Sequence, residues 1–207
     1  MSRIMSLLAV GVCLLNLATV ASADAVALDY TTPGSTDVWP AAFGWEFTTG
    51  SNVISVTSLG VQDQTTGDGA WRNTTNHDSQ VGIYKVSDQS LIVSTTVLAT
   101  DSNQGTKWLW HALASAVDLD PNTTYMIATG LPAGEWYNVG PSGVTSGDSN
   151  VTINSSQGFY SATGGAMAFP TNSTFFDTAA NFQYTATPEP MTMSLLAFGG
   201  LTLLRRR

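Results

Sequence analysis

The chain has 207 residues, 43% of them hydrophobic and only 11% charged, and a formal net charge of −8 at pH 7. All fifteen acidic residues lie between Asp24 and Glu189, with only three basic residues among them, which leaves this segment with a net charge of −12. Such a surface repels nucleic-acid phosphates and anionic lipids, so it excludes nucleic acid as a partner. The single cysteine, Cys13, lies in the first segment, so the body contains no thiol for a disulfide or for thiol chemistry.

Residues 1–23 have the order of a secretory signal peptide. Arg3 supplies the basic start, residues 7–15 are apolar, and the small residues Ala21 and Ala23 frame the predicted cleavage point after Ala23. The alternative is a permanent transmembrane anchor, but polar residues interrupt the apolar run well short of about 20 residues. We therefore expect cleavage by signal peptidase and export of the body.

Residues 24–187 predict one all-β domain. Phe43, Trp45 and Phe47 alternate with smaller or polar residues, the period-two pattern of a strand with one buried face. Further strands are predicted at 53–61, 80–86, 91–99, 107–113, 124–129 and 181–185. Because no helical periodicity separates them, two antiparallel sheets packed as a jelly-roll-like β-sandwich are favoured. We expect long loops over 140–172, with short strands such as 151–154.

Few residues in the body are suited to acid–base chemistry. His111 lies on the strand face opposite Trp108 and Trp110, where a hydrogen-bonded structural histidine is expected, and His77 is expected to close a turn. The body has two glutamates: Glu46, expected in solvent, and Glu135, in a Pro-Gly loop. A glycosidase needs two carboxyl groups about 5 to 10 Å apart. No such pair is evident, so an enzyme is not expected.

Calcium is the cofactor that the acidic body favours, because hard cations bind clustered carboxylate and carbonyl oxygens. The candidate ligands are Asp63 with Asp68, and Asp118 with Asp120. Asp and Asn also begin turns through local hydrogen bonds, which is the commoner reason for their presence there. No cofactor is required by the sequence, and a structural calcium ion stays an alternative.

Aromatic residues in predicted loops suggest a sugar-binding surface. Trp71, Trp136 and Tyr137 are the candidates, since an aromatic ring with an accessible face stacks on a sugar. We expect them to be partly exposed on one side of the sandwich if the body binds exopolysaccharide.

The last twenty residues have three parts: Pro188-Glu189-Pro190, an uncharged and mostly apolar run over 191–204, and Arg205-Arg206-Arg207. A helix over this run would be about 21 Å long, shorter than the roughly 30 Å hydrocarbon layer of a bilayer. Positive charge favours the cytoplasmic side, which places the body outside. The run is therefore expected to anchor the chain only transiently in the inner membrane.

This order resembles the PEP-CTERM sorting tail, also described as the ice-binding protein C-terminal domain. The resemblance implies a short hydrophobic sorting helix, recognition near Pro188-Glu189-Pro190 by an exosortase-type transpeptidase, and transfer of the body to the cell surface or extracellular matrix. The tail would then occupy residues 188–207.

The body from Phe43 onward resembles a secreted β-sandwich family of unknown function. The matching pieces are Gly44-Trp45-Glu46-Phe47, Leu59-Gly60-Val61, Gly67-Asp68-Gly69, His77-Asp78, Val81-Gly82-Ile83-Tyr84 and Leu119-Asp120-Pro121-Asn122-Thr123-Thr124-Tyr125. The family implies a surface sandwich without catalytic residues. The expected function is thus a non-enzymatic exported surface or matrix protein, with a carbohydrate-binding module as the alternative and a glycan-active hydrolase as the third possibility.

Overall fold

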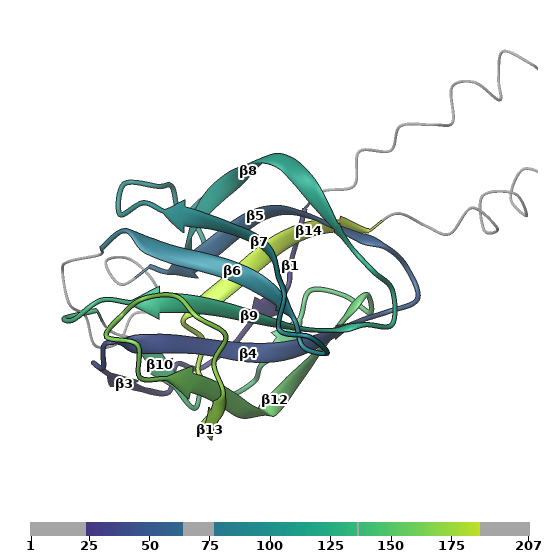
Figure 1. Ribbon diagram of the computed structural model, residues 1–207. Helices are drawn as coiled ribbons and strands as arrows, with labels where there is room; N and C mark the ends of the chain where they lie inside the picture. Colours follow the sequence, from purple (N-terminus) through teal and green to yellow (C-terminus); the bar gives the residue numbers. More distant parts are fainter. Residues whose placement is uncertain (1–23, 64–76, 136, 187–207) are drawn as a thin grey trace, which may run out of the picture.

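The computed structural model describes residues 24–63, 77–135 and 137–186 (Figure 1). Every regular element in these ranges is a β-strand, and all the strand pairs there are antiparallel. The prediction of an all-β body with antiparallel pairing is therefore confirmed. The signal peptide, the sorting tail, Asp68, Trp71 and Trp136 lie outside the described residues.

Two main sheets make up the body. The four-stranded sheet has the order β1-β14-β5-β8, formed by β1 (Ala25–Val26), β14 (Ala180–Ala186), β5 (Ile54–Gln62) and β8 (Trp108–Leu119). The six-stranded sheet has the order β13-β12-β4-β9-β6-β7, formed by β13 (Asn172–Thr174), β12 (Val151–Ser161), β4 (Ala41–Thr49), β9 (Thr124–Leu131), β6 (Ser79–Lys85) and β7 (Leu91–Val97). Two ribbons complete the fold: β2 (Leu28–Asp29) with β11 (Thr145–Ser146), and β3 (Ser35–Asp37) with β10 (Tyr137–Val139).

One hydrophobic core joins the two sheets. Trp45 of β4 is fully buried and stacks on Phe182 of β14, with ring centroids 6.3 Å apart. Its indole Nε1–H donates a hydrogen bond of 2.8 Å to the Ala180 carbonyl, which lies in the other sheet. Phe47 also contacts Phe182, at 4.7 Å between centroids. The alternation in β4 therefore aims its large rings at the opposite sheet, an arrangement consistent with a β-sandwich.

The other face of the six-stranded sheet has a smaller apolar cluster of its own. Tyr84, Met126 and Ala128 are buried there, and Met167 and Phe169 from the segment after β12 pack against them. This face is thus covered by residues that follow β12, which explains why β4 is buried along nearly its whole length.

The short strand predicted at 151–154 is the beginning of β12, but β12 runs on from Val151 to Ser161 and pairs with both β4 and β13, where the sequence predicted a loop after 154. Its register shifts between Ile153 and Gly158. Because the shift breaks the period-two pattern and the strand is rich in Ser, Asn and Gln, the sequence does not show the alternation that marks a half-buried strand.

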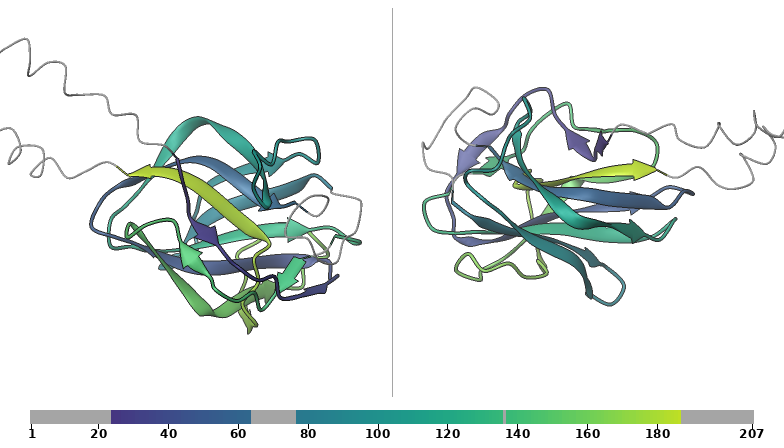
Figure 2. Two further views of the ribbon diagram at one scale, coloured as in Figure 1. Left: turned by 180° about the vertical axis from the view of Figure 1, so that it is seen from behind. Right: turned by 90° about the horizontal axis from the view of Figure 1, so that it is seen from above.

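Both ends of the described body lie at the same pole of the molecule. Ala25 pairs with Tyr184 and Val26 pairs with Gln183, so the first strand of the body runs against its last strand. Figure 1 shows these ends at the upper right, whereas the β3–β10 ribbon lies at the lower left. Figure 2 shows the same separation from behind and from above. We call the end that carries the β3–β10 ribbon the distal pole.

Candidate functional site

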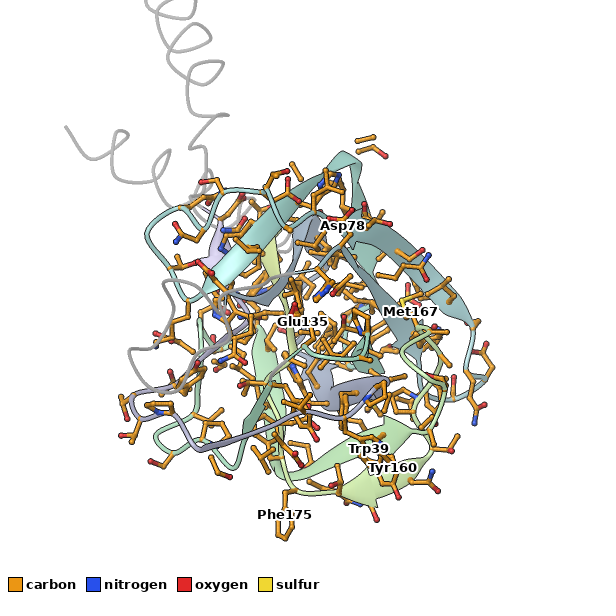
Figure 3. All side chains as sticks on the ribbon, turned by 90° about the vertical axis from the view of Figure 1, so that its left-hand side faces the viewer. Trp39, Asp78, Glu135, Tyr160, Met167 and Phe175 are labelled. Carbon is orange, nitrogen blue, oxygen red and sulfur yellow. The ribbon has the colours of Figure 1, made fainter. Side chains whose placement is uncertain are left out.

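A pair of aromatic rings, one exposed and one half-buried, lies at the distal pole (Figure 3). Trp39, between β3 and β4, is 40% exposed, and its ring centroid is 4.8 Å from that of the half-buried Tyr160, with an interplanar angle of 46°. Tyr160 of β12 is opposite Phe43 of β4, and Trp39 contacts the same Phe43 edge-on at 6.1 Å. We call Trp39 and Tyr160 the aromatic platform.

The platform rests on buried rings. Phe43 is 2% exposed, and the Tyr137 ring packs on it with centroids 4.1 Å apart. The prediction that Tyr137 is partly exposed is therefore wrong, since β10 holds its ring against the core and leaves it 5% exposed. Burial raises the pKa of the Tyr137 hydroxyl above its usual range, with the carboxylates of Asp37 and Asp177 adding to the shift. Tyr137 supports the platform from beneath.

Polar side chains border the platform. Asn172 of β13 is opposite Tyr160 in the register and is exposed, so it lies on the same side of the sheet as the Tyr160 ring. Asp37 is exposed at the end of β3 and accepts a hydrogen bond of 3.5 Å from the Tyr137 hydroxyl. The site thus combines accessible rings with an amide and a carboxylate that are open to solvent.

The structure brings together His77 and Glu135, which are 58 residues apart in the sequence. Glu135 Oε1 accepts a hydrogen bond of 2.6 Å from the His77 backbone N–H and lies 2.9 Å from the ring atom Nδ1. The Glu135 side chain is 3% exposed, whereas that of His77 is 45% exposed. Figure 3, which views the molecule from the left-hand side of Figure 1, shows Glu135 near the centre of the view.

Two opposing effects act on the Glu135 carboxyl. Burial raises its pKa, while the hydrogen bonds and the charge of His77 lower it, and burial has the larger effect. Oε2 is buried without a hydrogen-bond partner in the described part of the chain. Because its exposed fraction is so small and Oε1 is already engaged, Glu135 is placed to hold the 132–135 loop against the start of β6. Direct contact with a substrate is not what this geometry favours.

We expect Glu135→Ala to lower the free energy of unfolding by about 1–3 kcal/mol, because the His77 backbone N–H loses its buried acceptor and the ring Nδ1 loses the oxygen 2.9 Å away. His77→Ala is the matched control and should cost less, since it removes the ring but leaves the backbone N–H to donate to Oε1. Urea denaturation followed by circular dichroism measures both. An effect of His77→Ala as large as that of Glu135→Ala would contradict the anchoring role.

His111 has the structural role that its sequence position predicts. It is opposite Leu59 in the β8–β5 register, whereas Trp110 is opposite Gly60, so the histidine and this tryptophan lie on different faces. Its Nδ1 is 2.9 Å from Asp101 Oδ2. That oxygen also accepts a hydrogen bond of 2.8 Å from the Leu98 backbone N–H, which fixes the loop between β7 and β8.

Among the calcium candidates, Asp63 follows the end of β5, whereas Asp118 pairs with Ser55 near the start of β5. Asp63 is buried, and its Oδ2 accepts a hydrogen bond of 2.9 Å from the Asn103 side chain. Asp118 accepts a hydrogen bond from Ser55, and Asp120 forms an ion pair of 3.0 Å with Lys85. Over residues 24–63, 77–135 and 137–186, no group of three or more His, Cys, Asp or Glu side chains is placed to hold a metal ion. Calcium binding stays a prediction.

Asp177 is a buried acid that the sequence analysis did not identify. It is 1% exposed, and within the described residues neither carboxylate oxygen has a hydrogen-bond partner. Burial raises its pKa well above the usual range, and the nearby Ala179 amide opposes only part of that shift. Asp177 bridges to Val139 of β10, the strand that also carries Tyr137.

Glu46 is half-buried, where the sequence predicted full solvation, because Met126 is its partner on the covered face of β9. Trp45, Trp108 and Trp110 are buried, as expected for core or sheet-face tryptophans. Among the tryptophans that the structure describes, Trp39 is exposed, and the sequence analysis did not recognise this. The sequence does indicate the exposure of Trp39. Trp39 comes before Pro40 and before the alternating pattern of β4, so the pattern does not predict that its ring is buried.

No protein-family model and no curated protein matches this chain. Within the described residues there is also no helix of the length and apolar character needed to span a bilayer.

Proposed function

We propose that this chain is a non-enzymatic protein of the cell surface or extracellular matrix, an exported β-sandwich delivered by a PEP-CTERM-type sorting tail. Signal peptidase removes residues 1–23, and the apolar run of the tail holds the chain transiently in the inner membrane. An exosortase-type transpeptidase then acts near Pro188-Glu189-Pro190 and transfers the body outward.

The pairing of β1 with β14 is the observation that carries this proposal. It places the end of β14, where the tail begins, at one pole, and leaves the distal pole with its exposed rings at the other. A body attached through its C-terminal end would therefore present the distal pole to the surroundings. This is the geometry that a displayed domain needs.

The state of Glu135 supports a non-enzymatic role. A glycoside hydrolase needs a carboxyl group that reaches the glycosidic oxygen and a second one across the bond. The Glu135 side chain is 3% exposed and its Oε1 is engaged by His77. Glu46 lies in β4, where Met126 is its neighbour on the covered face, so the two glutamates of the body are not arranged as an exposed acid pair.

We expect protein recovered from the cell surface to lack residues 191–207. Replacing Arg205, Arg206 and Arg207 with Gln should reduce surface display and leave uncleaved chain in the membrane fraction, because the positive end fixes the orientation of the tail. Mass spectrometry of surface and membrane fractions measures both results.

Arg72→Gln, which changes a basic residue of the body, is the control and should be displayed normally. An intact Arg207 terminus on surface protein would contradict transfer by a transpeptidase, whereas retention of the chain inside the cell would contradict export itself.

A further inference from the structure

We propose that the aromatic platform, Trp39 and Tyr160, binds a neutral polysaccharide chain at the distal pole. A sugar-binding surface needs a ring face that water leaves easily, with polar groups beside it for the hydroxyl groups. Trp39 is 40% exposed, and its contacts with Phe43 and Tyr160 are inclined at 69° and 46°. Neither the Phe43 ring nor the Tyr160 ring stacks flat on the indole of Trp39, because both contact it at an angle.

The platform is held in a fixed arrangement before a ligand arrives. Tyr160 is a strand residue opposite Phe43, and Phe43 in turn packs on the buried Tyr137 ring. Pro40 restricts the backbone between Trp39 and β4. Because these rings are already ordered, binding loses little side-chain entropy, which favours affinity for a ligand that offers weak contacts.

The bordering side chains fit sugar hydroxyl groups. Asn172 carries an amide that both donates and accepts, and it is directly opposite Tyr160. Asp37 accepts, and it precedes Trp39 by two residues in the same chain segment. Asn172 thus offers a donor and an acceptor beside Tyr160. Asp37 offers an acceptor near Trp39 in the chain, although its Oδ1 already accepts a hydrogen bond of 2.7 Å from the Val38 N–H.

Charge selects among polysaccharides. The only charged group in this set, Asp37, is negative, and the segment between the targeting ends carries −12. An anionic polysaccharide would be repelled by this negative charge, whereas a neutral polysaccharide would not be repelled. That the ligand belongs to the matrix around the cell rests on the proposed function, while the binding itself depends only on the platform.

Native gel electrophoresis in gels containing a soluble polysaccharide tests the site, because the acidic protein migrates readily and binding slows it. The probes are hydroxyethylcellulose, glucomannan and dextran as neutral polymers and alginate as an anionic one. We expect at least one neutral polymer to retard the full-length protein. We expect Trp39→Ala to weaken that binding by about tenfold or more, equivalent to about 1.4 kcal/mol.

Leu91→Ala is the matched control, because Leu91 is an exposed apolar residue on the edge strand β7, at the other side of the six-stranded sheet. It should bind as the unmodified protein does. Tyr160→Phe keeps the ring and should retain most of the affinity, whereas Tyr160→Ala should not. Circular dichroism melting of each variant shows that the fold is kept.

Three results would overturn the proposal: no retardation by any neutral polymer, retardation by alginate alone, or unchanged retardation of Trp39→Ala. The variant with Gln at positions 205, 206 and 207 separates the two proposals. It should lose surface display and still be retarded in the gel. A failure of the sorting proposal therefore leaves the binding result unchanged, and a failure of the binding proposal leaves the sorting result unchanged.

Discussion

Trp45→Ala is expected to lower the free energy of unfolding by about 3–5 kcal/mol, as for other large buried aromatic side chains. Trp45 is fully buried, stacks on Phe182 and donates its indole N–H to Ala180 in the opposite sheet. The substitution leaves a cavity between the sheets and a carbonyl without its donor. Since small domains have a total stability of about 5–15 kcal/mol, this loss is a large fraction of the total.

Trp45→Phe separates the two contributions, because it keeps an aromatic ring and removes the N–H, for an expected loss of about 1–3 kcal/mol. Trp39→Ala is the matched control, because it is the same substitution at an exposed position. It should lower the free energy of unfolding by less than either Trp45 variant does. Urea denaturation followed by circular dichroism gives all three values. Equal losses at positions 39 and 45 would show that Trp45 is not the link between the sheets.

Asp177→Asn is expected to stabilise the protein at pH 7 by about 1 kcal/mol or more, because folding places this carboxyl in a buried site where it must either take up a proton or carry a poorly compensated charge. Burial raises the pKa of Asp177 in the folded state, so between the unfolded and the folded pKa the folded chain binds more protons than the unfolded chain. The stability that the protonated carboxyl contributes is complete below the ordinary carboxyl pKa of about 3.9 and is lost as the pH rises toward the folded pKa. The difference between the variant and the original protein should therefore vanish at pH 3.

Asp148→Asn is a control with the opposite sign. Partial burial acts to raise the pKa of Asp148, but hydrogen bonds from the Tyr184 hydroxyl and from Asn150 hold it below its usual range. Its contribution is present above the unfolded pKa and is lost as the pH falls. This variant should be less stable than the original at pH 7 and equal to it at low pH. Melting curves recorded from pH 3 to 8 measure the stability of both variants. If the stabilities of Asp177→Asn and the original protein changed with pH in parallel, the effect attributed to the buried Asp177 carboxyl would be contradicted.

The strands with regular alternation could be predicted from the sequence. Phe43, Trp45 and Phe47 mark β4 because each second side chain enters the core. For β12 only the first four residues, 151–154, were predicted, because its register shift interrupts that period. β8 was predicted too short because its second half, beyond Leu113, carries small exposed residues. Alternation reports burial on one face, so a strand with a bulge or with two open faces leaves no such signal.

The contacts between distant residues of the candidate site could not be predicted from the sequence. His77 and Glu135 each stood out, but nothing local to either residue indicates that they meet across 58 positions. Tyr137 was expected to be partly exposed if the body binds exopolysaccharide, but it is buried because β10 pairs with β3 and turns the ring onto Phe43. Which loop residues are exposed depends on such long-range pairing, and a single sequence does not contain that information.

The position of β14 determines how the body would respond to tension. β14 lies between β1 and β5, and the chain leaves it at the pole opposite the aromatic platform. If the platform holds a polymer while the other pole is attached to the surface, the pull runs along the strand. The hydrogen bonds on both sides of β14 are then loaded together and must rupture together, unlike the bonds of a strand peeled from its end one at a time. The fold would thus resist shear best along the axis on which an anchored matrix protein is pulled.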